Sequence, residues 1–89
     1  MHKEKLLIIN SHFQLQWEEK QNAFILLYPE GMVQLNKSAG EVLNLCDGKN
    51  SCGTITSKLE EKFNMNGLLK DIEEFLEDAI NREWVKYHE

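Results

Sequence analysis

The chain lacks long hydrophobic runs. Its longest apolar run covers residues 23–28, whereas a membrane-spanning helix needs roughly 20 such residues. Residues 6–9 follow basic residues, but four apolar residues are too few for the core of a secretion signal. We therefore expect a cytoplasmic chain that does not enter a membrane. Its two cysteines, Cys46 and Cys52, are then expected to be reduced thiols.

Positive charge is also scarce. The chain has 10 Lys and Arg against 15 Asp and Glu, which gives a net charge of −5. Nucleic-acid binding rests on clustered bases, and here they are scattered singly, so we expect no nucleic-acid partner. A small helix-turn-helix DNA-binding regulator stays open as the weaker alternative. Its expected recognition helix offers Lys58 and Lys62, which Glu60 and Glu61 offset.

The sequence contains no convincing set of catalytic or metal-binding residues. His2, His12 and His88 lie near the termini or on the polar side of an expected strand. Cys46 and Cys52 are separated by five residues without a second cysteine pair, so the spacing of a zinc site is missing. We expect no catalytic residue, no metal and no cofactor, and hence no enzyme. A hidden enzymatic role of the cysteine pair is a further, weaker alternative.

Three segments have the patterns of short strands. Residues 13–18 alternate between apolar and polar, which is typical of a half-buried strand. Residues 23–28 are apolar on both faces, as in a central strand. Pro29-Glu30-Gly31 then predicts a turn, and residues 32–35 a third strand. Short strands joined by tight turns predict an antiparallel meander.

A first helix is expected after the meander. Asn36 or Ser38 can cap it, and Ser38 with Glu41 has the spacing of a capping box. Asp47-Gly48 is expected to end it, because glycine readily adopts the left-handed C-cap conformation. The apolar face of this helix would consist of Ala39, Val42, Leu43 and Cys46.

Two more helices are expected in the remainder. Ser51 or Thr54 can cap the second, whose inner face would be Ile55, Leu59 and Phe63, and residues 64–67 would end it. The last helix has the strongest period, while its five carboxylates between residues 71 and 78 fall on the outer face. Its apolar positions are Leu68, Leu69, Ile72, Phe75, Leu76, Ala79 and Ile80. Residues 84–87 either end this helix or form a short extended tail.

These elements predict an α+β fold, a small winged helix-turn-helix-like domain in which a three-stranded antiparallel sheet is followed by a three-helix bundle. Residues 11–89 would form this single domain. Residues 1–10 would be an N-terminal arm that is frayed and flexible, or a strand that pairs only in an oligomer and gives a homodimer by strand exchange.

Two features indicate a binding surface. The apolar stripe of the last helix spans about 140°, more than the roughly 100° needed to dock on a small core. The strand at 32–35 ends the meander and carries no Pro, Lys or inward charge to protect its edge. The alternatives are that a central helix is simply well covered, and that four residues are too short to need protection.

Several segments, in the same order, resemble the PqqD family of pyrroloquinoline quinone (PQQ) biosynthesis. They are Leu15-Gln16-Trp17-Glu18, Leu27-Tyr28-Pro29-Glu30-Gly31, Leu35-Asn36 with Ser38-Ala39, Leu43 with Leu45-Cys46-Asp47-Gly48, and Asp71-Ile72-Glu73-Glu74-Phe75-Leu76. The chain departs from the family pattern at Gly40, where a better helix former is usual, and at Glu83-Trp84, where Gly-Trp is more familiar.

The resemblance implies a RiPP recognition element, a domain that binds the leader of a ribosomally made precursor peptide. The precursor PqqA would add as a β-strand between the third strand and the third helix, and would be presented to PqqE, a radical S-adenosylmethionine enzyme that holds the iron-sulfur clusters. A leader-recognition module of another RiPP pathway is the alternative. The peptide-binding residues implied are Met32, Val33, Gln34, Leu35, Asn36, Ile72, Phe75, Leu76 and Ala79.

Overall fold

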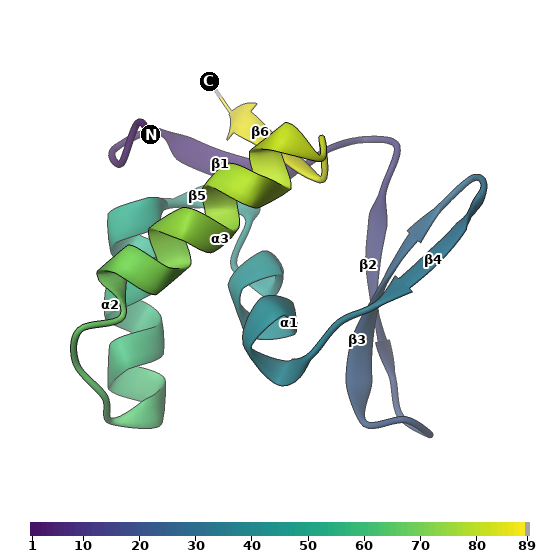
Figure 1. Cartoon of the computed structure of the whole chain (residues 1–89), viewed down its shortest axis with the longest axis horizontal. Coiled ribbons are helices and arrows are strands. Elements are labelled where there is room, and N and C mark those ends of the chain that lie inside the picture. The colour runs from purple at the N-terminus through teal and green to yellow at the C-terminus, as the bar shows by residue number, and fades with distance from the viewer. Residues whose placement is uncertain (89) are drawn as a thin grey trace.

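The computed structural model describes residues 1–88, which form three helices and two separate three-stranded antiparallel sheets. One sheet is the expected meander, and it stands beside the helices (Figure 1). The elements are β1 (Leu6–Ile9), β2 (Gln14–Glu18), β3 (Ala23–Tyr28), β4 (Gly31–Gln34), α1 (Lys37–Asn44), β5 (Asp47–Ser51), α2 (Cys52–Phe63), α3 (Leu69–Asn81) and β6 (Val85–His88). The predicted α+β class is confirmed.

The meander has the strand order β2-β3-β4, with β3 in the centre as its apolar pattern predicted. Ile25 and Leu26 of β3 are buried, at 6% and 0% exposure. Tyr28 pairs with Gly31, so Pro29 and Glu30 alone make the turn into β4. The turn between β2 and β3 contains Asn22, which has a positive φ of 53°.

The second sheet was not predicted. It has the order β5-β1-β6, so the N-terminal strand β1 is paired on one side with a strand from the middle of the chain and on the other with the last strand. Leu7 pairs with Asn50 on one side and Tyr87 on the other. The expectation of a frayed arm, or of a strand that pairs only in an oligomer, is therefore wrong for residues 6–9. Residues 85–88 take the extended form of the two alternatives, and residue 89 lies outside the described part.

The first helix begins as predicted and ends earlier. Asn36 is the cap, and its Oδ1 accepts from the Ala39 amide at 2.8 Å. Glu41 does not return to the helix start as in a capping box, because its carboxylate accepts from Lys62 Nζ at 2.8 Å. The helix stops at Asn44, and Asp47-Gly48 belongs to β5. The predicted C-cap at 47–48 is wrong because pairing with β1 recruits these residues into a strand.

The other two helices lie where the sequence placed them. Ser51 caps α2 by accepting from the Thr54 amide at 3.2 Å. Asn64 ends α2 in the left-handed conformation. The amide of Leu68, which precedes α3, donates to Glu60 Oε2 at 3.0 Å and thereby joins the start of α3 to α2. The expected three-helix bundle is thus interrupted between α1 and α2 by β5.

The core lies where the helices meet both sheets. α1 packs against β3 of the meander at Gly40, where an added Cβ would stand 2.7 Å from Phe24 Cδ2. The departure from the family pattern at Gly40 therefore has a steric reason. The buried core residues are Leu7, Leu26, Leu35, Val42, Leu43, Cys46, Cys52, Ile55, Leu59, Ile72, Leu76, Ala79 and Val85.

Candidate functional site

The outer edge of β4 offers unpaired main-chain groups in a defined register. Within residues 1–88, β4 has a neighbouring strand on one side only. The Leu35 amide donates to the Phe24 carbonyl at 3.0 Å, and antiparallel ladders alternate between pairs that do and do not exchange hydrogen bonds. Val33 therefore also points its main-chain groups toward β3. Met32 and Gln34 direct their N–H and C=O groups to the free edge.

The side chains of this strand alternate in the same way. Val33 and Leu35 turn toward the core, and Leu35 is only 6% exposed. Met32 and Gln34 are exposed, with Met32 at 52%. An added strand would thus contact Met32 and Gln34 through the main chain. The side chains of Val33 and Leu35 pack against the core and fix β4 in place.

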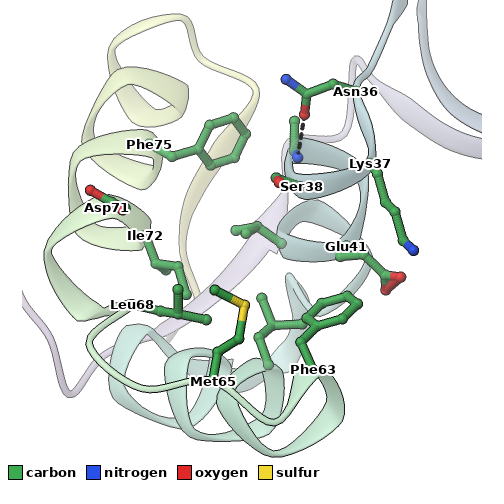
Figure 2. A pocket seen from close by; sticks show the side chains of 13 residues that line it. Asn36, Lys37, Ser38, Glu41, Phe63, Met65, Leu68, Asp71, Ile72 and Phe75 are labelled. Carbon is green, nitrogen blue, oxygen red and sulfur yellow. Dashed lines mark hydrogen bonds between the residues drawn. The ribbon is translucent and has the colours of Figure 1, made fainter.

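A pocket of about 450 Å³ opens where β4 gives way to α1. It lies among α1, the C-terminal end of α2 and the first half of α3, as Figure 2 shows. Phe75 and Ile72 reach into it from α3, opposite Ser38 of α1 (Figure 2). The full lining is Asn36, Lys37, Ser38, Ala39, Glu41, Val42, Leu59, Phe63, Met65, Leu68, Asp71, Ile72 and Phe75. Most of these side chains are apolar, which is typical of ligand pockets.

The structure places only part of the expected peptide-binding set at this pocket. Asn36, Ile72 and Phe75 line it. Leu76 and Ala79 are 0% and 1% exposed and belong to the core, so neither offers a surface to a ligand. The border of the α3 stripe that faces the pocket is therefore the one with Leu68, Ile72 and Phe75 rather than the one with Leu76.

The pocket also includes residues that were not expected in a site. Phe63 was assigned to the inner face of α2, and Met65 to the break after it, yet both line the pocket. Met65 is 52% exposed, so its side chain is accessible at the pocket. A Met directly after the predicted end of the second helix was the signal available in the sequence, but the pattern does not tell which element it faces.

Comparison with known proteins gives the family. The family described as "Coenzyme PQQ synthesis protein D (PqqD)" matches residues 23–85. This chain belongs to the PqqD family. It is 41% identical over 83 residues to the PqqA binding protein of Methylococcus capsulatus, covering 93% of this chain and 89% of that protein. It is 47% identical over 77 residues to the PqqA binding protein of Azotobacter vinelandii, covering 85% and 84%.

A solved structure confirms the fold of this PqqD-family chain. It is the solution NMR structure of the PqqD truncation of Methylobacterium extorquens PqqCD, described as a functional and stand-alone RiPP recognition element. The TM-score is 0.78 at 23% sequence identity, over 97% of this chain and 94% of that chain. The family match over residues 23–85 and the relatives above 40% identity confirm the resemblance inferred from the ordered sequence segments.

The cysteines of this PqqD-family chain have environments unsuited to nucleophilic chemistry. Burial raises the pKa of the Cys46 thiol to about 12, and the nearby Asp47 carboxylate adds to the shift. Burial also raises the pKa of the Cys52 thiol, with a contribution from Glu73. Since the thiolate is the nucleophile and the metal ligand, both groups are held in their unreactive form.

The described part of the chain carries neither a metal-binding cluster nor a helix that could span a membrane. Across residues 1–88, no group of three or more His, Cys, Asp or Glu side chains is placed to hold a metal ion. In the same part of the chain, every helix is too short or too polar to cross a membrane.

Proposed function

We propose that this chain binds the leader of the precursor peptide PqqA as an added strand on β4 and presents it to the radical S-adenosylmethionine enzyme PqqE during PQQ biosynthesis. The relatives named PqqA binding protein support the identity of the peptide. The observation that carries the binding mode is the free β4 edge, whose outward main-chain groups end beside an apolar pocket.

Binding would follow from the alternation along β4. A peptide strand exchanges hydrogen bonds with Met32 and Gln34, and this main-chain pairing supplies affinity for an extended segment. Alternate peptide side chains then face the helices, where Ile72 and Phe75 provide an apolar wall. Side-chain selection therefore comes from α3 and main-chain affinity from β4.

The chemical step is assigned to PqqE, and this chain is proposed to be non-catalytic. Holding peptide and enzyme in one complex raises the local concentration of the reacting segment. Iron-sulfur clusters require sets of cysteine thiolates, and the two thiols here are buried and protonated. The complex would assemble in the cytoplasm, where the precursor leaves the ribosome.

Strand exchange remains the proposed route to a homodimer. In one chain, β1 already pairs with both β5 and β6. Exchange of β1 between two copies would preserve the β1–β5 and β1–β6 pairs, which is a low-cost route to a dimer. Peptide binding on β4 would be available in the monomer and in such a dimer, because β4 is in the other sheet.

The sharpest test removes one outward amide. Gln34→Pro deletes a donor to the peptide without removing a ladder hydrogen bond, and Pro is tolerated on edge strands. Losing this bond and leaving the peptide carbonyl unpaired costs on the order of 1–2 kcal/mol, so we expect about tenfold weaker binding of labelled PqqA. Fluorescence anisotropy measures the affinity, and thermal unfolding should change little.

Gln34→Ala is the matched control, because it shortens the side chain and keeps the amide; its affinity should equal that of the wild type. Amide NMR signals of Met32 and Gln34 should also shift on titration with PqqA. Equal binding by Gln34→Pro, with unshifted signals along β4, would rule out strand addition. Binding of an unrelated leader in preference to PqqA would instead assign the chain to another RiPP pathway.

A further inference from the structure

The outer edge of β2 is a second sheet edge without a neighbouring strand. In the part of the chain that the structure describes, β2 pairs with β3 only. The Phe24 carbonyl bonds on the β4 side, so the next residue of β3, Ile25, bonds on the β2 side, where Gln16 is its partner. Because the direction of the hydrogen bonds alternates along a strand, Leu15 and Trp17 direct their N–H and C=O groups to the free edge.

The side chains of β2 separate into a polar and an apolar face. The polar face consists of Gln14, Gln16 and Glu18. On the other face, Leu15 packs against the core, whereas Trp17 is 46% exposed. The centroids of the Trp17 and Phe24 rings lie 5.0 Å apart, at an interplanar angle of 72°. Trp is enriched among the residues that dominate interface energies, so this oriented and exposed ring indicates a contact with a partner.

β2 also lacks the features that usually protect a sheet edge. Natural edge strands commonly carry Lys, Pro or an irregular register, which hinder pairing with another chain. The edge strands of the other sheet do so: β5 contains Lys49 and has a shift in its pairing with β1, and β6 contains Lys86. β2 contains neither Lys nor Pro. β4 is also unprotected, and the proposed function assigns its edge to the leader.

The sequence of β2 is nearly symmetric about Gln16, and this symmetry indicates which partner fits. A twofold interface requires a self-complementary patch. If two copies paired antiparallel about an axis at Gln16, each Leu15 would lie opposite the Trp17 of the second copy. Each Gln14 would lie opposite the Glu18 of the second copy. An aliphatic side chain then faces an aromatic one, an amide faces a carboxylate and no like charges are opposed, as in favourable pairs on adjacent strands.

The same alignment satisfies the polar groups at the edge. Leu15 and Trp17 both direct main-chain groups outward, so as opposite residues they would exchange both N–H···O bonds. Glu18 Oε1 accepts from the Lys20 amide at 3.2 Å, which holds the carboxylate and leaves Oε2 for the Gln14 side chain of the second copy. The two Gln16 side chains would meet on the axis, where each amide can both donate and accept.

We propose that two copies of this chain pair their β2 strands about Gln16 and form one six-stranded sheet with the order β4-β3-β2-β2-β3-β4. The contact needs no exchange of β1, which belongs to the other sheet. Each β4 edge lies at an end of the combined sheet, so both leader sites stay accessible and one dimer carries two leaders. The inference goes beyond the proposed function and does not depend on it. A pairing of two five-residue strands is small, so the dimer is weak and depends on protein concentration.

Two lysine substitutions on the same face of β2 test the alignment. Gln16→Lys places two ammonium groups against each other on the axis. Gln14→Lys is the matched control, because it adds the same charge to the same exposed face but places it opposite the Glu18 carboxylate of the second copy. Sedimentation equilibrium of the full chain measures the dissociation constant of the dimer, which we expect on the order of 100 µM for the wild type.

The two variants should move this dissociation constant in different ways. Gln16→Lys should raise it about tenfold or more, because like charges directly opposite each other destabilise paired strands. Gln14→Lys should leave it unchanged or lower it. Trp17→Ala should also raise it, because each copy loses the ring that covers Leu15. In wild-type NMR spectra, the amide signals of Leu15 and Trp17 should shift as the protein is concentrated, while those of β4 stay constant.

Three results would overturn the proposed contact. A wild-type chain that stays monomeric up to about 1 mM has no such contact. A dimer that Gln16→Lys leaves intact, with unshifted Leu15 and Trp17 signals, is held elsewhere, as by exchange of β1. Equal weakening of the dimer by Gln16→Lys and Gln14→Lys would contradict an axis at Gln16.

The outcomes also separate this contact from the proposed function. The NMR measurement needs no variant, so it decides the question even if a substituted chain fails to fold. Labelled PqqA should bind wild type and Gln16→Lys with the same affinity and one leader per chain, because β4 is unchanged. One leader per dimer would overturn the arrangement with β4 at both ends. Absence of PqqA binding would refute the proposed function, whereas a dimer sensitive to Gln16→Lys but not to Gln14→Lys would still support the contact.

Discussion

The two sheets of this domain are built in opposite ways. The meander β2-β3-β4 joins strands that follow one another in sequence through short turns. The sheet β5-β1-β6 joins the beginning, middle and end of the chain. One sheet is local and keeps a free edge beside the pocket, whereas the other closes the fold.

The difference indicates that the closing sheet contributes mainly to stability, whereas the meander provides the binding edge. Leu7 and Val85 of the closing sheet are 0% and 1% exposed. In the meander, Trp17 and Met32 are 46% and 52% exposed, and the buried residues cluster toward α1. The local sheet can present an open edge because the helices and the closing sheet supply most of the core.

The largest expected effect is on the closing sheet. Leu7→Ala should lower the free energy of unfolding by about 2–5 kcal/mol, because it leaves a cavity in a fully buried site. Leu15→Ala is the matched change in the meander, and its half-buried side chain should cost clearly less. Urea denaturation followed by tryptophan fluorescence measures both. Equal losses in the free energy of unfolding would show that the two sheets contribute equally to stability.

The junction between α1 and the meander gives an intermediate effect. Gly40→Ala places a Cβ 2.7 Å from Phe24 Cδ2, and such overpacking typically costs about 1–3 kcal/mol. Thermal unfolding should therefore occur at a lower temperature, and Phe24→Leu in the same chain should recover part of the loss.

Gly53→Ala is the control for this prediction, because its Cβ would meet only Ser51 Oγ at 3.9 Å. Alanine in a helix should stabilise by about 0.4–1 kcal/mol at a compatible site. If Gly40→Ala also stabilised the domain, the close approach of α1 to β3 would not limit the position of the meander.

The smallest effect concerns pH at the closing sheet, where the Cys46 carbonyl accepts from the Ile9 amide at 3.1 Å. The pKa of Cys46 rises from 9.0 to about 12 on folding. Above pH 9 the unfolded chain loses this proton while the folded chain keeps it, so stability falls as pH rises. By about pH 10 the loss should be on the order of 1 kcal/mol. Cys46→Ala should lack this component.

Denaturant titrations of both proteins from about pH 8 to about pH 10 check the slope. Other groups titrate in the same range, so the quantity of interest is the difference between wild type and Cys46→Ala. If stability fell with pH equally in wild type and in Cys46→Ala, burial would not raise the pKa of the Cys46 thiol in the folded state.

The meander could be predicted from sequence because its information is local. Strict alternation in β2 and apolar residues throughout β3 define the faces, and Pro29 marks the turn. β5 had no such signal, since Asp47-Gly48-Lys49-Asn50-Ser51 contains mostly turn-forming residues. Its extended form depends on β1, and Asn50 is buried there with Nδ2 donating to the Leu45 carbonyl at 3.0 Å. A pairing across forty residues is invisible to a local pattern.

The site was only partly predictable for a related reason. The sequence indicated that β4 is an edge and that α3 has a wide apolar stripe. Which amides point outward depends on the register with β3, which the Leu35 to Phe24 bond defines. Which border of the stripe is open depends on where α1 and α2 pack. Leu76 and Ala79 were assigned to the site because periodicity cannot distinguish a core position from a pocket wall.

The pairing of β1 with β6 also determines where this domain can be joined to other molecules. The His2 amide donates to the Tyr87 hydroxyl at 3.0 Å, so the first residues and the end of β6 lie together at the closing sheet, away from the meander (Figure 1). An affinity tag, a fluorophore or a fused enzyme attached at either end would leave from the same side. Such attachments would leave the β4 edge accessible, and either end is suitable for immobilising the domain in binding assays.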